Sequence, residues 1–317
     1  MNTAGFCILV SGPTGVGKTA FVDILAQELP AEIVNGDMGQ LYTPITIGTA
    51  KPDWKRSAIP HHMFDQINQP EPFTVIAFRQ AVAATCADIW KRNKIPIIVG
   101  GSGYYLTSLF FPPAQHDQII QKHTHNPDQD LWQQLHDIDP VRAKEIDPSD
   151  SYRIERALDI WYSTGIKPSV YVPVYDPIFK SYLFIWLTRE RKDLYARIDA
   201  RTQQMVAEGW IEEVRALMGT PWQNFLETKK IIGYPEVIAY CQGAISKQEM
   251  IATIAQKSRN YAKRQMTFMR MLKKKLANVN LPAGAGKEWL IECNLTNKSV
   301  HQYSKELVPL VKKIVGQ

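Results

Sequence analysis

The chain has 317 residues, of which 45% are hydrophobic and 21% charged, and this composition predicts a globular protein of roughly two domains. No apolar stretch reaches membrane-spanning length, and the apolar run before Ser11 is too short for the core of a signal peptide, so we expect a cytoplasmic protein. Four scattered cysteines without Cys-x-x-Cys spacing argue against a zinc site and against a disulfide framework.

The net charge of +6 is unevenly distributed along the sequence. Residues 1–150 carry 11 Lys and Arg against 16 Asp and Glu, whereas residues 151–317 carry 26 against 15. A basic half of this kind predicts a polyanionic partner. Solvated surface lysines are the alternative explanation that the charge alone leaves open.

A glycine-rich segment near the N-terminus predicts a phosphate-binding loop. Residues 12–19 read Gly-Pro-Thr-Gly-Val-Gly-Lys-Thr, after an apolar strand pattern at 6–10 and before a helical pattern at 20–28. Strand, loop and helix in this order distinguish a P-loop from a chance glycine pattern. We therefore predict that a diphosphate is bound by Gly12, Thr14, Gly15, Val16, Gly17, Lys18 and Thr19. Lys18 supplies a positive charge, and the Thr19 hydroxyl can hold Mg²⁺, directly or through water.

The first third of the chain predicts an α/β fold with a P-loop NTPase-like parallel sheet flanked by helices. A helix pattern at 74–92 lies in the sequence between strand patterns at 32–35 and 95–100. This βαβ alternation is typical of a doubly wound sheet. A second glycine-rich turn, at 100–103, follows the strand at 95–100. Ligands of such sheets bind at the carboxyl ends of the strands, so this turn belongs to the predicted site.

The pattern changes after residue 111, and we expect a small helical insertion domain at 112–181. The core is then formed by 1–111 and 182–275, with a buried strand at 182–187 and long helices at 190–218 and 247–275. Residues 276–317 are expected to form an appendage for which the sequence suggests no function.

Asp37 is the candidate catalytic base, because it closes the second strand beside the phosphate loop. A carboxylate there can take a proton from a nucleophile, and Gln40 can hydrogen-bond a polar substrate edge. A helix cap or a ligand of Mg²⁺-bound water is the alternative for Asp37. The strands at 95–100 and 182–187 do not end in the acid that a hydrolysing NTPase needs, so a small-molecule kinase or another transferase remains.

Two groups of basic residues are candidates for a polyanion. Residues 257–275 contain eight basic residues and no acidic one. Arg153 and Arg156 share a helix face and could grip a phosphate backbone, with salt bridges to Asp150 or Asp159 as the alternative.

Eight runs of the sequence, taken together and in order, resemble the tRNA dimethylallyltransferase family, also called tRNA isopentenyltransferases or IPP transferases. They are 12–19, 37–42, 48–52, 60–65, 99–105, 153–158, 232–234 and 261–265. The chain departs from the family at Pro235, where a basic residue is usual, at Met38, where serine is usual, and in a shorter insertion.

The resemblance implies transfer of a dimethylallyl group from dimethylallyl diphosphate to N6 of the adenine on the 3′ side of the anticodon in tRNA. Asp37 is then the base, with Lys18 and Thr19-bound Mg²⁺ on the leaving diphosphate, in a protein that we expect to be a monomer. The implied tRNA contacts are Asp37, Met38, Gly39, Gln40, Ser102, Tyr152, Arg153, Arg156, Arg259, Lys263, Arg264 and Gln265. A P-loop kinase, a prenyltransferase of free adenine nucleotides and an RNA-binding protein without activity are the alternatives.

Overall fold

The computed structural model describes residues 3–111, 121–124, 130–171, 178–277 and 290–316. It divides into two compact units, one formed by Met1–Thr107 with Ile178–Gln317 and the other by Ser108–Pro177. The expected start of the insertion, residue 112, lies outside the described residues.

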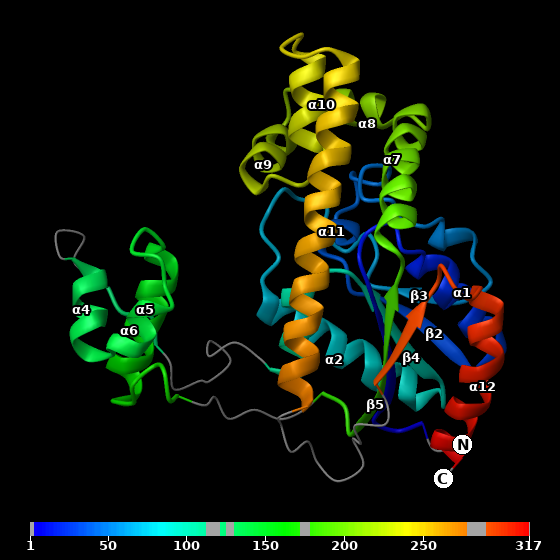
Figure 1. Cartoon of the computed structure of the whole chain (residues 1–317), viewed down its shortest axis with the longest axis horizontal. Coiled ribbons are helices and arrows are strands. Elements are labelled where there is room, and N and C mark those ends of the chain that lie inside the picture. Colours follow the sequence, from blue (N-terminus) through cyan, green and yellow to red (C-terminus); the bar gives the residue numbers. More distant parts are fainter. Residues whose placement is uncertain (1–2, 112–120, 125–129, 172–177, 278–289, 317) are drawn as a thin grey trace. The chain divides into compact units, whose positions relative to one another are not determined.

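The larger unit is built on a parallel sheet of six strands in the order β3-β2-β4-β1-β5-β6 (Figure 1). In chain order these strands are β1 (Phe6–Ser11), β2 (Ala31–Asn35), β3 (His61–His62), β4 (Ile95–Gly100), β5 (Ser181–Thr188) and β6 (Leu290–Asn294). β1 is central, with Ile8 in register with Ile97 of β4 and Leu183 of β5. The structure confirms the expected α/β fold with a parallel sheet.

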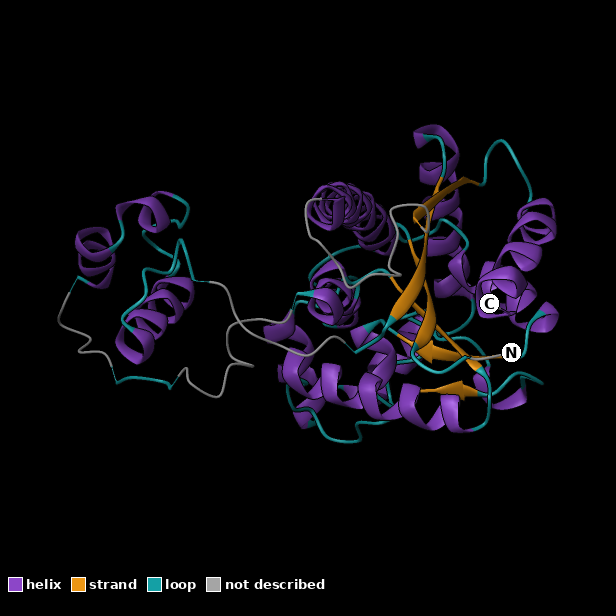
Figure 2. Cartoon of the chain, turned by 90° about the horizontal axis from the view of Figure 1, so that it is seen from below, coloured by secondary structure: helices purple, strands orange, loops and turns teal. Residues whose placement is uncertain are grey.

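Helices cover both faces of this sheet (Figure 2). On one face, Ile8 and Val10 join a core completed by Leu25 of α1 (Lys18–Glu28) and Val311 of α12 (Val300–Gly316). On the other face, the Ser11 hydroxyl donates to Met269 of α11. The remaining helices of this unit are α2 (Val75–Lys91), α3 (Gly103–Phe110, which continues into the second unit), α7 (Arg191–Ala207), α8 (Trp210–Leu217), α9 (Pro221–Lys229), α10 (Tyr234–Cys241) and α11 (Lys247–Ala277), with short 3-10 turns at Met38–Leu41 and Trp54–Arg56.

The helical segment expected at 190–218 is two helices. Gly209 lies between α7 and α8 with a φ of 103°, a left-handed conformation that glycine adopts without strain. The break turns α8 away from α7, so that Trp210 becomes fully buried. The sequence pattern also missed α9 and α10.

The last part of the chain takes part in the sheet. β6 pairs with β5 along its whole length, from Phe184 opposite Leu290 to Thr188 opposite Asn294. α12 packs against α1, the helix that follows the phosphate loop. The tail, expected as an appendage, therefore belongs to the same compact unit as the phosphate loop.

The second unit is a small helical body formed by α4 (Leu131–Ile138), α5 (Pro140–Lys144) and α6 (Ser151–Thr164). Its core consists of Leu135, Ala143, Ile146, Ile154, Ala157 and Leu158. Buried Asp139 ties the unit together, since its carboxylate accepts from the backbone N–H groups of Arg142 and Ser169. Across the described residues of both units, no helix combines the length and apolar character required to cross a membrane.

Candidate active site

Two arginines donate hydrogen bonds to carbonyl groups of the phosphate loop. Arg197 Nε donates to the Gly15 carbonyl at 3.0 Å, and Arg189 Nε donates to the Val16 carbonyl at 2.9 Å. Gly15 and Gly17 have φ values of 79° and 109°, which a side chain would strain. This backbone precedes the N-terminus of α1, where N–H groups and the helix dipole favour an anion.

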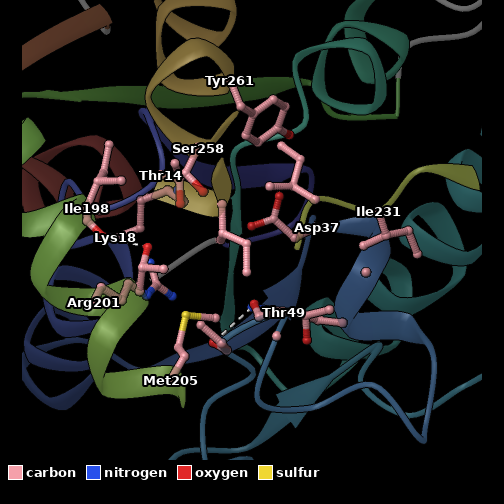
Figure 3. Close-up of a pocket in the computed structure, with 18 of the residues that line it drawn as sticks. Thr14, Lys18, Asp37, Thr49, Ile198, Arg201, Met205, Ile231, Ser258 and Tyr261 are labelled. Carbon is pink, nitrogen blue, oxygen red and sulfur yellow. Dashed lines mark hydrogen bonds between the residues drawn. The ribbon is translucent and has the colours of Figure 1, made fainter. Parts of the chain in front are cut away.

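A cavity of about 780 Å³ opens beside this loop (Figure 3). Most of the predicted site residues line it, namely Thr14, Gly15, Gly17, Lys18, Thr19, Asp37, Met38, Gly39, Gln40, Ser102, Arg264 and Gln265. Gly12 and Val16 lie outside the lining and are buried in the framework of the loop. The phosphate loop and the Asp37 turn, which the sequence placed near each other, thus share one cavity.

Lys18 lies at the cavity wall with its ammonium group close to the loop backbone. Its Nζ donates to the carbonyl oxygens of Gly12 and Pro13 at 3.1 and 3.3 Å. Burial lowers the pKa of Lys18, Asp37 opposes this shift, and Arg201 adds to it. A bound diphosphate would neutralise this concentration of positive charge.

Asp37 is fixed by backbone and side-chain contacts at the end of β2. Its Oδ1 accepts from the Gly101 N–H at 2.8 Å, and its own N–H donates to Asn35 Oδ1 at 2.9 Å. Among the described residues, no hydrogen bond reaches its second oxygen, Oδ2. Asp37 therefore presents an oriented carboxylate to the cavity with one oxygen available to accept a proton.

Two arginines of α7 form a wall of the site that the sequence analysis missed. Arg197 and Arg201 are one helical turn apart, and both line the cavity. Arg201 makes no hydrogen bond or ion pair within the described part of the chain, and burial lowers its pKa while Asp37 opposes that shift. The i, i+4 spacing of the two arginines predicts that they share one face of the helix. This spacing does not indicate that the face lies toward the phosphate loop.

The wall opposite the phosphate loop is formed by the segment after the Asp37 turn. Gln40 Nε2 donates to the carbonyl groups of Thr49 and Ala50 at 3.1 and 3.2 Å, so this amide already supports the wall. Lys51, from the same segment, forms a buried ion pair with Asp65. The ion pair thus connects two of the family-like runs, 48–52 and 60–65.

A single carboxylate, Glu213 of α8, anchors this wall to the helices. Its Oε2 accepts from the N–H groups of Thr46 and Ile47 at 2.8 and 2.7 Å. Its Oε1 accepts from the Gly48 N–H at 3.3 Å and from the buried Tyr234 hydroxyl at 2.7 Å. Gly48 itself packs against Trp210, since an added Cβ would lie 2.2 Å from Trp210 Nε1.

The other basic residues singled out from the sequence have protein partners. Arg259 of α11 forms an ion pair with Asp199 of α7, whereas Lys263 is exposed. In the helical insertion, Arg153 Nε lies 3.3 Å from Asp150 Oδ2, and Arg156 Nη1 lies 2.6 Å from Asp159 Oδ2. Both salt bridges considered from the sequence are therefore present, while the neighbouring Tyr152 is 61% exposed.

The cavity has basic side chains from other positions, although position 235 is a proline where the family usually has a basic residue. Pro235 is the second residue of α10 and is not among the residues that line the cavity. Lys229, Lys230 and Arg264 all line it. Positive charge therefore reaches the cavity from α7, α9 and α11.

A sequence model of the IPP transferase family matches residues 40–272 of this chain. The chain belongs to the IPP transferase family. It is 36% identical over 268 residues to tRNA dimethylallyltransferase 1 of Citrifermentans bemidjiense, covering 82% of this chain and 88% of the relative. It is 38% identical over 271 residues to tRNA dimethylallyltransferase of Anoxybacillus flavithermus, covering 83% and 86% of the two chains.

Solved structures agree with this assignment. The full-length tRNA isopentenylpyrophosphate transferase of Bacillus halodurans matches with a TM-score of 0.68 at 28% identity, over 98% of this chain and 97% of its own. A eukaryotic dimethylallyltransferase solved while acting on tRNA matches with a TM-score of 0.80 at 26% identity, over 99% and 80% of the two chains. The IPP transferase family is a family of prenyl-transferring enzymes, and its fold is the P-loop NTPase-like fold expected from the sequence.

The cavity residues fit a magnesium ion that is bound together with a diphosphate. Thr19 is exposed and lines the cavity. No cluster of three or more His, Cys, Asp and Glu side chains suited to a metal occurs in the ranges that the structure describes. Mg²⁺ commonly takes few protein ligands and completes its shell with phosphate oxygens and water. Thr19 would be the protein ligand of such an ion.

Replacing Glu213 with alanine is expected to lower the free energy of unfolding by about 2–4 kcal/mol, because several donors lose a charged acceptor. Urea unfolding followed by tryptophan fluorescence measures this change. Glu212→Ala is the matched control, since Glu212 is exposed and pairs with Arg215 across one helical turn, so about 0.5 kcal/mol or less is expected. Equal losses for the two variants would show that Glu213 does not anchor the cavity wall.

Proposed function

We propose that this chain transfers a dimethylallyl group from dimethylallyl diphosphate to N6 of the adenine 3′-adjacent to the anticodon of tRNA. The observation that carries this proposal is the placement of the phosphate loop and Asp37 in the lining of one cavity. Membership of the IPP transferase family supports it over a small-molecule kinase or a prenyltransferase of free nucleotides.

The phosphate loop acts on the leaving group of this reaction. The bond between the allylic carbon and the diphosphate oxygen breaks, so negative charge grows on the diphosphate and positive charge spreads over the allyl group. The loop N–H groups, Lys18 and Arg201 stabilise the growing anion in a pocket partly shielded from water. Thr19 would hold Mg²⁺, which would supply further positive charge beside the diphosphate.

Asp37 supplies the base at the other end of the reaction. The N6 lone pair of adenine is delocalised into the ring, so N6 attacks well only if a proton leaves as the new C–N bond forms. The Gly101 N–H holds Asp37 Oδ1, which leaves Oδ2 to accept that proton. The products are inorganic diphosphate and the prenylated adenine.

The tRNA partner is recognised by its anticodon stem-loop. The target adenine must leave the stack to enter the cavity, at a cost of about a few kcal/mol. Met38, Gly39 and Ser102 line the cavity where that base would lie. Exposed Lys263 and cavity-lining Arg264 are proposed to meet backbone phosphates. On the insertion, Tyr152, Arg153 and Arg156 are proposed to contact the stem, with the two arginines exchanging Asp150 and Asp159 for phosphates. The enzyme is proposed to act as a monomer.

A transfer assay tests the proposed function directly. The protein is incubated with Mg²⁺, radiolabelled dimethylallyl diphosphate and either unmodified tRNA with adenine next to the anticodon or free AMP. We expect label on tRNA only, and none after chelation of Mg²⁺. Label on AMP alone would identify a prenyltransferase of free nucleotides. Consumption of ATP without transfer of label would identify a kinase.

Asp37→Asn is expected to reduce the single-turnover transfer rate by about 10² to 10⁴-fold, the usual contribution of a general base. The asparagine Oδ1 can still accept from the Gly101 N–H, so the turn keeps its conformation. Filter binding should give a tRNA dissociation constant within about twofold of the parent. An unchanged single-turnover rate would remove Asp37 from the role of base.

Arg201→Gln is expected to weaken the binding of inorganic diphosphate by roughly tenfold to a hundredfold, as expected for loss of a charge-assisted hydrogen bond. Burial and Arg201 both lower the pKa of Lys18, so removing Arg201 raises that pKa. Lys18 then stays protonated to higher pH, so the pH at which diphosphate affinity is lost on the alkaline side rises.

Calorimetric titration of diphosphate across pH measures both effects. Arg191→Gln is the control, because Arg191 is exposed on the same helix and lies over the ring of Tyr195. If Arg201→Gln behaves like this control, the α7 arginine has no role in holding the diphosphate.

Replacing Lys263 and Arg264 together with glutamine is expected to weaken tRNA binding and to reduce the slope of log affinity against log salt by about 1.5, for two lost phosphate contacts. Fluorescence anisotropy at several salt concentrations measures this slope. The pair Lys312→Gln and Lys313→Gln removes the same charge from exposed positions of α12. A slope equal to that of this control would mean that the basic face of α11 is only solvated.

A further inference from the structure

We infer that Gln265 is a positioning residue that holds the phosphate loop and the catalytic turn at a fixed separation, an inference that rests on the proposed function. The family resemblance implies a tRNA contact for Gln265. Its side chain is only 5% exposed, however, and it is packed between two backbone segments rather than displayed on the surface. The exposed neighbours Lys263 and Arg264 of the same helix remain available for RNA.

The carboxamide of Gln265 makes one hydrogen bond to each side of the site. Its Oε1 accepts from the Thr14 N–H of the phosphate loop at 2.8 Å. Its Nε2 donates to the Gly101 carbonyl at 2.8 Å. The N–H of that same Gly101 donates to Asp37 Oδ1 at 2.8 Å. An unbroken chain of three short hydrogen bonds thus joins the loop that holds the leaving group to the base.

A side-chain amide suits both ends of this bridge. A carboxamide has an acceptor and a donor on one plane, whereas a carboxylate lacks the donor and a hydrocarbon lacks both. The approach is so close that a Cβ added to Gly101 would lie 2.3 Å from Gln265 Nε2. Because the bridge is buried, a lost partner is not replaced by water at low cost.

The helix that carries Gln265 is itself seated on the sheet at this point. One turn further along α11, buried Met269 accepts from the Ser11 hydroxyl at the end of β1 at 3.5 Å. Gln265 therefore approaches the site from a helix whose position is set by the central strand. Since base and leaving group must act on one adenine and one allyl carbon at the same time, their separation affects the rate of transfer. A misplacement of about 1 Å is sufficient for a hundredfold loss.

Gln265→Glu tests this inference, with the chain otherwise intact. It keeps the acceptor for Thr14 but places an acceptor against the Gly101 carbonyl. We expect the single-turnover transfer rate, at saturating tRNA and dimethylallyl diphosphate, to fall about tenfold to a hundredfold. The tRNA dissociation constant should stay within about twofold. Gln248→Glu, in the exposed first turn of the same helix, is the matched control and should leave the rate unchanged.

Gly101→Ala provides a second test without altering Gln265, because its methyl group displaces the carboxamide. If both variants break the same bridge, the double variant is no slower than the slower single variant, whereas independent defects multiply. Thermal unfolding confirms that the variants are folded.

A loss confined to tRNA affinity and restored by saturating tRNA would make Gln265 an RNA contact and overturn the inference. A rate for Gln265→Glu equal to that of the parent would also overturn it. If the parent itself transfers no label to tRNA, the proposed function fails instead, so the two failures are distinguishable.

Discussion

The site depends on the close approach of two strand ends, which glycine alone permits. The Gly36 N–H donates to the Val99 carbonyl at 2.7 Å, and a Cβ on Gly100 would lie 2.6 Å from the carbonyl carbon and oxygen of Gly36. With no side chain between them, the backbones after β2 and β4 run in contact. Asp37 then meets the Gly101 N–H directly, so its carboxylate is oriented by backbone rather than by a flexible partner.

Helix α11 extends this constraint to the phosphate loop and to the surface. Its buried face includes Ala262, Gln265 and Met269, while Lys263 and Arg270 on other sides of the helix are exposed. The same helix packs along α7, which carries Arg197, one of the two arginines that bind the loop, and Arg259 pairs with Asp199 between the two helices. The exposed basic side chains of α11 and its contacts with the interior of the candidate site are therefore carried by one helix.

Local patterns predicted the fold and part of the site, because the phosphate loop and the Asp37 turn are each short contiguous segments at the ends of buried strands. The rest depends on contacts between distant segments. Glu213 meets residues 46–48, and Arg197 meets Gly15, through helices whose orientation no local pattern encodes. Gln265 lies 251 positions from Thr14, and only the packing of α11 on the sheet brings them together. The sequence shows a glycine at position 209, where the helix breaks. It does not show that this break leads to the burial of Trp210.

The strand order explains why this phosphate loop suits departure of a diphosphate rather than hydrolysis of a triphosphate. In P-loop hydrolases an acid at a strand end holds Mg²⁺ beside the loop. Here β4, the neighbour of β1, ends in Gly100 and leads into Gly101, where the neutral amide of Gln265 takes the adjacent space. The carboxylate follows β2, one strand further from the loop. Under the proposed function, an allyl group and an adenine, the two components between which a carbon–nitrogen bond has to form, would lie between base and anion.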